Sequence, residues 1–342
     1  MRFRIEQGVI WQKLLKLTER AIKGWADEQG YSNLLFAELD YRLLQTLDAL
    51  YRNNFLAERL YMKGGTAINK LYLEKTSRLS VDLDFNHVGP KEQVLKERPD
   101  IRREIMKLLK KQDDSYVIHS SHRYEQTTIK SRYKTVIGPP QSFKIEISHV
   151  ERFPILDSVQ KQLATPDGQA NVITYQIEEL TATKLRAFFE RLKGRDIYDL
   201  FFISRLELHP IITRKMFLYY FYRSRKVFNP KVHYGNLSKR YSSEKYVDDV
   251  STFIKPTVTF SLKEAAQQVI SYYSFLKELD DRDKDFLALA GLLLGRKVAK
   301  KSLAKVKKVQ KPLKHLFKDL QISPEARDIS KDEIRLFQRN KR

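Results

Sequence analysis

Cysteine is absent from the 342-residue sequence, which excludes disulfide bonds, thiolate metal sites and a cysteine nucleophile. Long apolar runs are absent too, since no segment approaches the roughly 18 uninterrupted apolar residues that a membrane helix needs. The first residues carry charges with no long apolar stretch behind them, so we expect no signal peptide. Together these absences favour a protein of a reducing, cytoplasmic compartment with no membrane partner.

Glycine and proline are also scarce. The 12 glycines and 11 prolines exclude low-complexity and fibrous classes, and the 42% of hydrophobic residues suffice for packed cores. A chain of this length suits two domains. We expect the boundary near residue 173, because the stretch 151–173 contains Pro154, Pro166 and Gly168 and has the composition of a connecting loop.

Acidic residues are few relative to basic ones. The 64 Lys and Arg residues outnumber the 42 Asp and Glu residues, which gives a formal net charge of +22. Such an excess indicates a polyanionic partner, most simply a nucleic acid, with an anionic membrane or an ordinary basic surface as alternatives. Residues 296–318 contain lysines and an arginine but no acid, so this segment is either a handle for a phosphate backbone or a solvated tail.

The most informative stretch runs from Met62 to Phe85. It opens with Gly64 and Gly65, and glycine allows the backbone to adopt a positive φ and to approach a ligand closely. A helix is predicted from Thr66 to about Leu73, with Thr66 as its N-cap. Because the first N–H groups of a helix lack partners and carry the positive end of its dipole, this turn suits a triphosphate.

The same stretch ends in a predicted strand, Ser80 to Phe85, in which polar and apolar residues alternate. Asp82 and Asp84 then lie on one face of the strand. Two neighbouring carboxylates repel each other unless a cation joins them, and Mg²⁺ prefers such oxygen ligands together with nucleotide phosphates. The order of turn, helix and paired acids therefore predicts a magnesium–nucleotide site.

Each part of this pattern also has an ordinary interpretation. Paired aspartates on a strand are often only a solvated face, and two glycines before a helix are often only a turn. Their occurrence in this order within about twenty residues favours the functional interpretation. The pattern is not a Walker loop, because the sequence contains no G-x-x-x-x-G-K-[ST] motif.

Hydrophobic spacing predicts the other elements. Helices are expected over residues 5–61, with a continuous apolar stripe from Leu34 to Leu60, and over residues 92–111 and 261–294. Strands are expected over residues 116–118, 127–133 and 143–148, the last two joined by a turn at 138–140.

The segment 177–204 reads as two helices, the first of which ends at Lys193 and Gly194. The following segment, 211–246, interleaves aromatic residues with cations. Aromatic residues among cations can stack on bases, but we interpret these rings as the core side of a helix whose basic side faces outward.

Three motifs give the sequence a resemblance to a known family. These are K-G-G-T-A at residues 63–67, R-x-S-x-D-x-D-F at residues 78–85, and A-x-K-L-x-A followed by R-x-x-x-R-D-x-x-D within residues 182–199. They resemble the AbiEii/AbiGii toxins of the nucleotidyltransferase superfamily, which has the polymerase-β-type catalytic fold. The resemblance implies an α+β fold, with a nucleotidyltransferase-like mixed sheet, flanking helices and a helical C-terminal domain. Residues 1–173 would then form a helical extension and the catalytic core, and residues 174–342 a helical domain with the basic tail.

The resemblance also implies roles for individual residues. Asp82 and Asp84 would hold Mg²⁺ and be catalytic. The implied nucleotide-binding residues are Lys63, Gly64, Gly65, Thr66 and Lys184.

Asp196 would orient a cation or act as general base, and Asp199 would be a packing partner. The ordinary alternative for this second block is a surface set of ion pairs with Arg191 and Arg195, which would be worth little individually. A third metal ligand often comes from a neighbouring strand in the superfamily. Glu146 suits that role, and it can equally be an exposed residue paired with Lys144.

The function implied is a toxin of a type IV toxin–antitoxin or abortive phage infection system. It would transfer a nucleotidyl group from an NTP (GTP, CTP or another) to an RNA, with the tRNA 3′ end as the expected acceptor. Its expected partner is a separately encoded antitoxin with a winged-helix DNA-binding domain. The alternatives are an NTP-binding regulator with little transfer activity and a transferase that acts on a small molecule.

Overall fold

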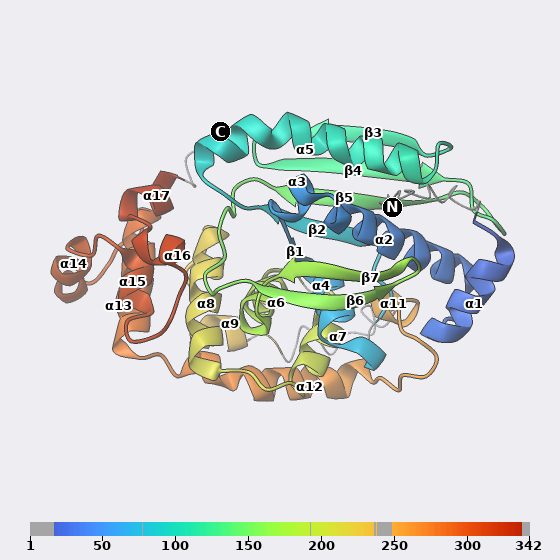
Figure 1. The fold of residues 1–342 in the computed structure, drawn as a ribbon. Helices are drawn as coiled ribbons and strands as arrows, with labels where there is room; N and C mark the ends of the chain where they lie inside the picture. The colour runs from blue at the N-terminus through green and yellow to red at the C-terminus, as the bar shows by residue number, and fades with distance from the viewer. Residues whose placement is uncertain (1–16, 77, 192, 236, 238–247, 337–342) are drawn as a thin grey trace, which may run out of the picture.

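A computed structural model describes residues 17–76, 78–191, 193–235, 237 and 248–336 (Figure 1). Its first described helix is α1 (Glu19–Gln29), which Thr18 caps by accepting a hydrogen bond from the backbone of Ala21. The earlier part of the predicted N-terminal helix, including Trp11, lies outside the described residues.

The centre of the molecule is a seven-stranded sheet in the order β3-β4-β5-β2-β1-β7-β6. Its strands are β1 (Leu60–Lys63), β2 (Asp82–His87), β3 (Val117–His122), β4 (Gln126–Tyr133), β5 (Gln141–Ser148), β6 (Val159–Thr165) and β7 (Gly168–Thr174). The pairs β1–β7 and β2–β5 are parallel, and the remaining neighbours are antiparallel. The sheet is therefore mixed.

Two long helices, α2 (Leu34–Arg52) and α5 (Lys91–Gln112), pack on one face of the sheet (Figure 1). On that face Leu83, Phe85 and Ile145 are fully buried, and the ring of Tyr51 on α2 contacts Phe85. Strand alternation then sends Asp82, Asp84 and their neighbours to the opposite face.

On the opposite face α4 (Gly64–Leu71) packs against β1, β2 and β6, and α6 (Ile177–Glu190) packs against α4. The helix α7 (Gly194–Ile203) packs against both of these. The 3₁₀ turn η1 (Glu74–Thr76) follows α4. This side of the sheet therefore carries both the glycine turn and the second motif block.

Apart from α3, which contacts α2 and β1, the remaining helices pack around α6 and α7 or extend away from the sheet (Figure 1). They are α3 (Asn54–Ala57), α8 (Pro210–Arg223), α9 (Pro230–Gly235), α11 (Asp248–Ser251), α12 (Leu262–Tyr272), η3 (Tyr273–Lys277), α13 (Asp281–Leu293), α14 (Lys300–Lys307), α15 (Pro312–Leu316), α16 (Pro324–Asp328) and α17 (Lys331–Leu336). On α8 the rings of Phe217, Tyr219 and Phe221 are buried, which confirms that these aromatics belong to the core. The part of segment 211–246 that follows residue 237 lies outside the described residues.

Several predictions of local structure were wrong. Residues 60 and 61, predicted to end a helix, belong to β1, and residues 159–174 form the β6–β7 hairpin, not a connecting loop. Pro166 and Gly168 lie at the tight turn of that hairpin, where Thr165 pairs with Gly168. The composition of a turn was thus mistaken for that of a linker.

Two helix starts also differ from the prediction. The helix after the glycine pair begins at Gly64, so Thr66 lies within its first turn and is not its N-cap. The Thr66 hydroxyl instead donates a hydrogen bond to the Asp82 carbonyl, which ties α4 to β2. Gly194 does not end α6, because it is the first residue of α7.

The predicted fold class is confirmed by this mixed sheet with flanking helices and a helical C-terminal part. The domain boundary near residue 173 stays a prediction. It falls at the end of β7, three residues before α6 begins at Ile177.

Candidate functional site

Gly64 and the Asp84 carboxylate lie in direct contact at the start of α4. Gly64 has a φ of +76°, a conformation that side chains disfavour. A Cβ atom at this position would collide with Oδ2 of Asp84. The sequence needs glycine here for both reasons, and the close approach brings the paired-acid strand against the N-terminus of the helix.

The carboxylates of β2 lie beside Glu146 on one face of the sheet. In the parallel β2–β5 register Asp82 is opposite Lys144, and Asp84 is opposite Glu146. Residues opposite each other across two strands share a face and have Cβ atoms about 5 Å apart. The register therefore places the three proposed metal ligands on one face of two neighbouring strands.

Burial, with a smaller contribution from neighbouring acids, raises the pKa values of the two aspartates of β2. Burial raises the pKa of Asp84 to about 6, with Glu146 and Asp82 adding to the rise and Lys63 opposing it. Burial also raises the pKa of Asp82, against the opposing effect of Lys144. Such a set of acids disfavours its own ionised form and gains from a cation that neutralises it.

The donor set fits Mg²⁺ by its chemistry, since it consists of hard carboxylate oxygens beside a helix N-terminus. Within the described ranges no group of three or more Asp, Glu or His side chains is arranged to hold a metal ion. Glu146 forms no ion pair with Lys144 in the described part of the chain, so the structure gives no support to the ordinary interpretation of Glu146 as half of that pair.

Lys184 of α6 lies behind Gly65 and is held by two aspartates. Its Nζ is 2.7 Å from Oδ2 of Asp199 and 3.1 Å from Oδ1 of Asp196. Both carboxylates are buried, and the Lys184 side chain is 7% exposed. A Cβ added to Gly65 would lie 3.8 Å from Nζ of Lys184, so this ammonium lies close to the glycine turn.

Asp196 is shared between two cations. Besides Lys184, it accepts hydrogen bonds from Nε and Nη2 of Arg191, at 2.9 and 3.2 Å. The predicted alternative of a surface ion-pair set is wrong for Asp196 and Asp199, because both are fully buried. With its oxygens engaged in this way, Asp196 is placed to orient Lys184.

Arg78 and Asn69 complete this network, and the sequence reasoning assigned neither of them a role. Arg78 donates to both carboxylate oxygens of Asp199, at 2.9 and 2.8 Å. Asn69 donates to Asp199 and to the Gly65 carbonyl, and it accepts from the Arg78 backbone. Burial alone would raise the pKa of Asp199, but Arg78 and Lys184 lower it to about 2.

Arg78 belongs to the R-x-S-x-D-x-D-F motif, so its presence there was the available signal. Its role depends on Asp199, which is 121 residues further along the chain. No local pattern could have shown that pairing. The network fixes the positions of α4, α6 and α7 relative to one another.

Lys63 lies opposite Asp84 in the β1–β2 pair, and it too is held by an acidic residue. Its Nζ donates to Oε2 of Glu151 at 3.0 Å. Glu151 has a pKa lowered to about 2, because the cations Lys63, Arg186 and Arg223 outweigh the effect of burial. Glu151 is thus a third residue near the site, after Arg78 and Asn69, that the sequence reasoning missed.

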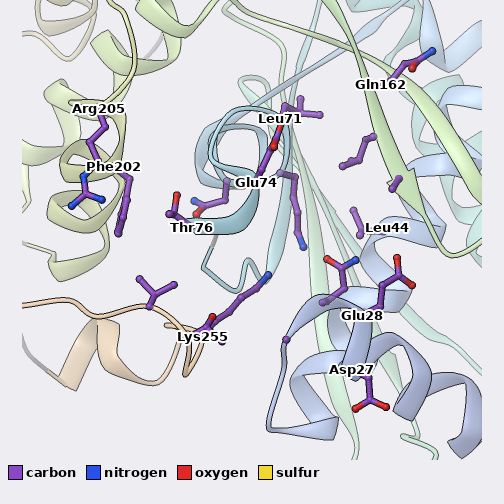
Figure 2. Close-up of a pocket in the computed structure, with 18 of the residues that line it drawn as sticks. Asp27, Glu28, Leu44, Leu71, Glu74, Thr76, Gln162, Phe202, Arg205 and Lys255 are labelled. Atoms are coloured by element: carbon purple, nitrogen blue, oxygen red, sulfur yellow. The ribbon is translucent and has the colours of Figure 1, made fainter.

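A cavity of about 870 Å³ lies at the other end of α4 (Figure 2). Its wall includes Leu71, Glu74 and Lys255, and none of the acids of β2 lines it. Lys255 reaches into it from the segment before α12 (Figure 2). The cavity is therefore separate from the glycine turn and the paired acids.

Comparisons with known proteins identify the family of the chain. The family model described as nucleotidyl transferase AbiEii toxin, type IV toxin–antitoxin system, matches residues 48–281. The chain belongs to this family. The match spans the glycine turn, the paired acids and the Lys184–Asp199 network, and a comparison with curated proteins finds no match.

Among solved structures the chain is similar to MenT4, a nucleotidyltransferase toxin from Mycobacterium tuberculosis H37Rv. The two share 20% sequence identity with a TM-score of 0.62, over 85% of this chain and 99% of that one. This similarity shows a common fold. A second match is CdnC from E. coli MS115-1, solved with ATP, at 11% identity and a TM-score of 0.24 over 88% of this chain and 98% of the other.

Membership of the family makes the protein a nucleotidyltransferase toxin of a type IV toxin–antitoxin system, which has a separate cognate antitoxin. No helix in the described ranges has the length and apolar composition to cross a membrane.

Proposed function

We propose that this AbiEii toxin transfers a nucleotidyl group from an NTP to an RNA, with Mg²⁺ as cofactor and the tRNA 3′ end as acceptor. The observation that carries the proposal is the contact between Gly64 at the start of α4 and the carboxylate of Asp84. It joins a phosphate-binding helix terminus to a metal-binding carboxylate within one contact distance.

Each residue of the site has a proposed task. The backbone N–H groups of Gly65 and Thr66 bind the triphosphate at the helix N-terminus. Lys184 contributes a fixed positive charge beneath the turn, and Asp196 orients it. Lys63, held by Glu151, lies on the other side of Asp84 and adds a second cation near the phosphates.

Asp82, Asp84 and Glu146 are the residues that would hold Mg²⁺. When bound, the metal would activate the attacking hydroxyl oxygen and neutralise the leaving pyrophosphate. The acids themselves lie at the edge of the covered sheet region and are partly exposed, so an acceptor can approach them from solvent. The predicted boundary near residue 173 would place these acids in one domain and Lys184 in the next.

An RNA acceptor is favoured over a small molecule by the net charge of +22. Aminoglycoside-like substrates are cations and would be repelled by such a surface. For the cognate antitoxin we propose a winged-helix DNA-binding protein, as the family resemblance implies.

The test is a transfer assay with four NTPs, each labelled at the α-phosphate, and total tRNA. We expect label to enter tRNA from at least one NTP in the presence of Mg²⁺. The variants Asp82→Asn and Asp84→Asn keep the size of each side chain but remove its charge, so each should reduce labelling by at least about 100-fold.

The matched control is Asp100→Asn, which removes an exposed carboxylate on α5 at the opposite face of the sheet. It should label tRNA like the unmodified protein. Equal labelling by the Asp82 variant and the control would show that the paired acids are not the metal ligands. Tight NTP binding without transfer to any RNA would favour a nucleotide-binding regulator.

A further inference from the structure

We propose that the open face of β3, β4 and β5 binds the phosphate backbone of the acceptor RNA and guides its end to the paired acids. The proposal rests on the proposed function, because it takes RNA as the acceptor. It assigns a docking surface to three strands that carry none of the proposed reactive residues except Glu146.

The sheet register aligns cations with the acids on one face. Asp82 on β2 is opposite Lys144 on β5, Lys144 is opposite Lys130 on β4, and Lys130 is opposite His119 on β3. Neighbouring strands lie about 4.8 Å apart. The row therefore runs outward from an acid of the site to the edge strand within about 15 Å.

Neighbouring rows on the same face add one further cation and small polar groups. Arg132 lies two residues beyond Lys130, opposite Val117 and Ser142. In the row of Glu146 the opposite residue on β4 is Thr128. Among the β3–β5 positions that share this face, Glu146 is the one acid, and it lies at the end next to β2.

The cations of this face are exposed, and the one acid that acts on any of them in the described part of the chain is Asp82, which is opposite Lys144. Lys130, Arg132 and Lys144 are each exposed, whereas the alternate residues Ile129, Ser131 and Ile145 are buried on the α5 side. In the described part of the chain none of the three cations forms an ion pair or a side-chain hydrogen bond. Their charges are therefore available to an external group.

The pairing of Lys130 with Lys144 lowers the stability of the sheet. Like charges directly opposite each other on two strands are destabilising, by a few tenths of a kcal/mol up to about 1 kcal/mol. An intervening acid would relieve the repulsion, yet no acid lies between them in the register. A polyanion laid across the strands would neutralise the pair, and the pair would lie beside the carboxylates where the chemistry is proposed.

The chemistry of the face favours RNA over an acidic protein. A sequence-independent acceptor strand needs regularly spaced cations next to the reactive groups, and it gains affinity by releasing counterions from its phosphates. The basic tail offers the same charge, but α14 lies at the far end of the molecule from the sheet (Figure 1). The β3–β5 face is therefore favoured over the basic tail because it lies next to the paired acids.

The test measures binding of fluorescently labelled total tRNA to the full chain by anisotropy, without nucleotide. We compare the double variant Lys130→Gln/Arg132→Gln with the unmodified protein. We expect at least a 10-fold loss of affinity at constant salt, and a slope of log affinity against log salt that is lower by about 1.5 to 2. Because no transfer is required, this result can be read even if the proposed reaction is wrong.

The matched control is Lys307→Gln/Lys308→Gln on the tail, where both residues are exposed. It should lose less than about 2-fold in affinity. Both double variants should melt like the unmodified protein and bind a fluorescent NTP with Mg²⁺ normally, since Lys130 and Arg132 lie two strands from β2.

Unchanged tRNA affinity in the sheet variant, or a larger loss in the tail variant, would overturn the proposal. So would a sheet variant that keeps tRNA affinity but loses binding of polyglutamate, because the face would then be a docking surface for an acidic protein.

Discussion

Gly64 and Gly65 show how two residues without side chains control the geometry of a site. A Cβ at Gly64 would strike Asp84 and strain the backbone, and a Cβ at Gly65 would lie 2.9 Å from Nη2 of Arg78. Both positions therefore bring α4 closer to a charged side chain than any other residue type permits.

Gly64→Ala should reduce nucleotidyl transfer by about 100-fold, because a displacement near 1 Å is enough to misplace reacting groups. The measurement is initial transfer rate at saturating NTP. Gly24→Ala on α1 is the control, since nothing lies within 4 Å of its added Cβ. The control should retain full activity and gain about 0.5–1 kcal/mol in stability. Equal activity of the two variants would contradict a close-approach role for Gly64.

His87 and His149 form a buried pair away from the paired acids. Their Nδ1 atoms are 3.3 Å apart, and neither ring is more than 4% exposed. Burial lowers the pKa of His87 to about 4, although Glu97 opposes this. Burial, together with His87, Arg98 and His122, lowers the pKa of His149 to about 3. Both rings are therefore neutral in the folded protein at neutral pH.

The stability of the fold should fall as pH decreases through this window. Between about pH 6.5 and pH 4 the unfolded chain binds protons that the folded rings refuse, so acid favours unfolding. His149→Gln, which can still hydrogen bond to Thr127, should remove on the order of 2–3 kcal/mol of this pH dependence. Urea unfolding across this pH range measures it. Parallel pH profiles for variant and unmodified protein would contradict the assignment.

At the scale of elements, the tie between Arg78 and Asp199 joins the start of β2 to α7. Breaking a buried ion pair leaves an uncompensated charge and costs about 3–5 kcal/mol. Asp199→Asn should therefore lower the free energy of unfolding by that amount, as measured in urea. The exposed pair Arg103–Asp100 is the control, and its loss should cost less than about 1 kcal/mol. Similar costs for both would show that the network does not hold the elements together.

The elements also show what the sequence could reveal. The alternation of residues 80–85 and the glycine pair are local signals, so the strand with Asp82 and Asp84 and the turn before α4 could be predicted. Residues 159–174 contain Gln160, Lys161 and Gln162 among their strand positions, and this polar composition concealed an outer hairpin of the sheet. The start of β1 was missed for a different reason, because Leu60 continues the apolar stripe of α2.

The residues of the site likewise divide into those that local signals reveal and those that only long-range contacts reveal. Residues chosen from local motifs, such as Asp84 and Lys184, lie close to the start of α4. Arg78, Asn69 and Glu151 act through partners far along the chain, and one sequence contains no record of those contacts. Long-range pairing is the part of the site that required three-dimensional coordinates.

At the scale of the whole molecule, the net charge of +22 should make RNA binding strongly dependent on salt. Transfer to tRNA should fall by at least 10-fold when salt rises from about 50 to about 200 mM. Binding of a fluorescent NTP with Mg²⁺, which uses short-range contacts, should change far less over the same range. Transfer that is insensitive to salt would instead favour a small-molecule acceptor.

The central claim is that the paired acids and the glycine turn form one metal–nucleotide site. Electron paramagnetic resonance of Mn²⁺, with an NTP analogue that cannot be cleaved at the α-phosphate, tests it without any acceptor. The account predicts that the nucleotide tightens Mn²⁺ binding to the unmodified protein, and that Asp82→Asn/Asp84→Asn weakens this binding by at least about 10-fold. Equal Mn²⁺ affinity in the presence of the analogue, for the variant and the unmodified protein, would contradict it.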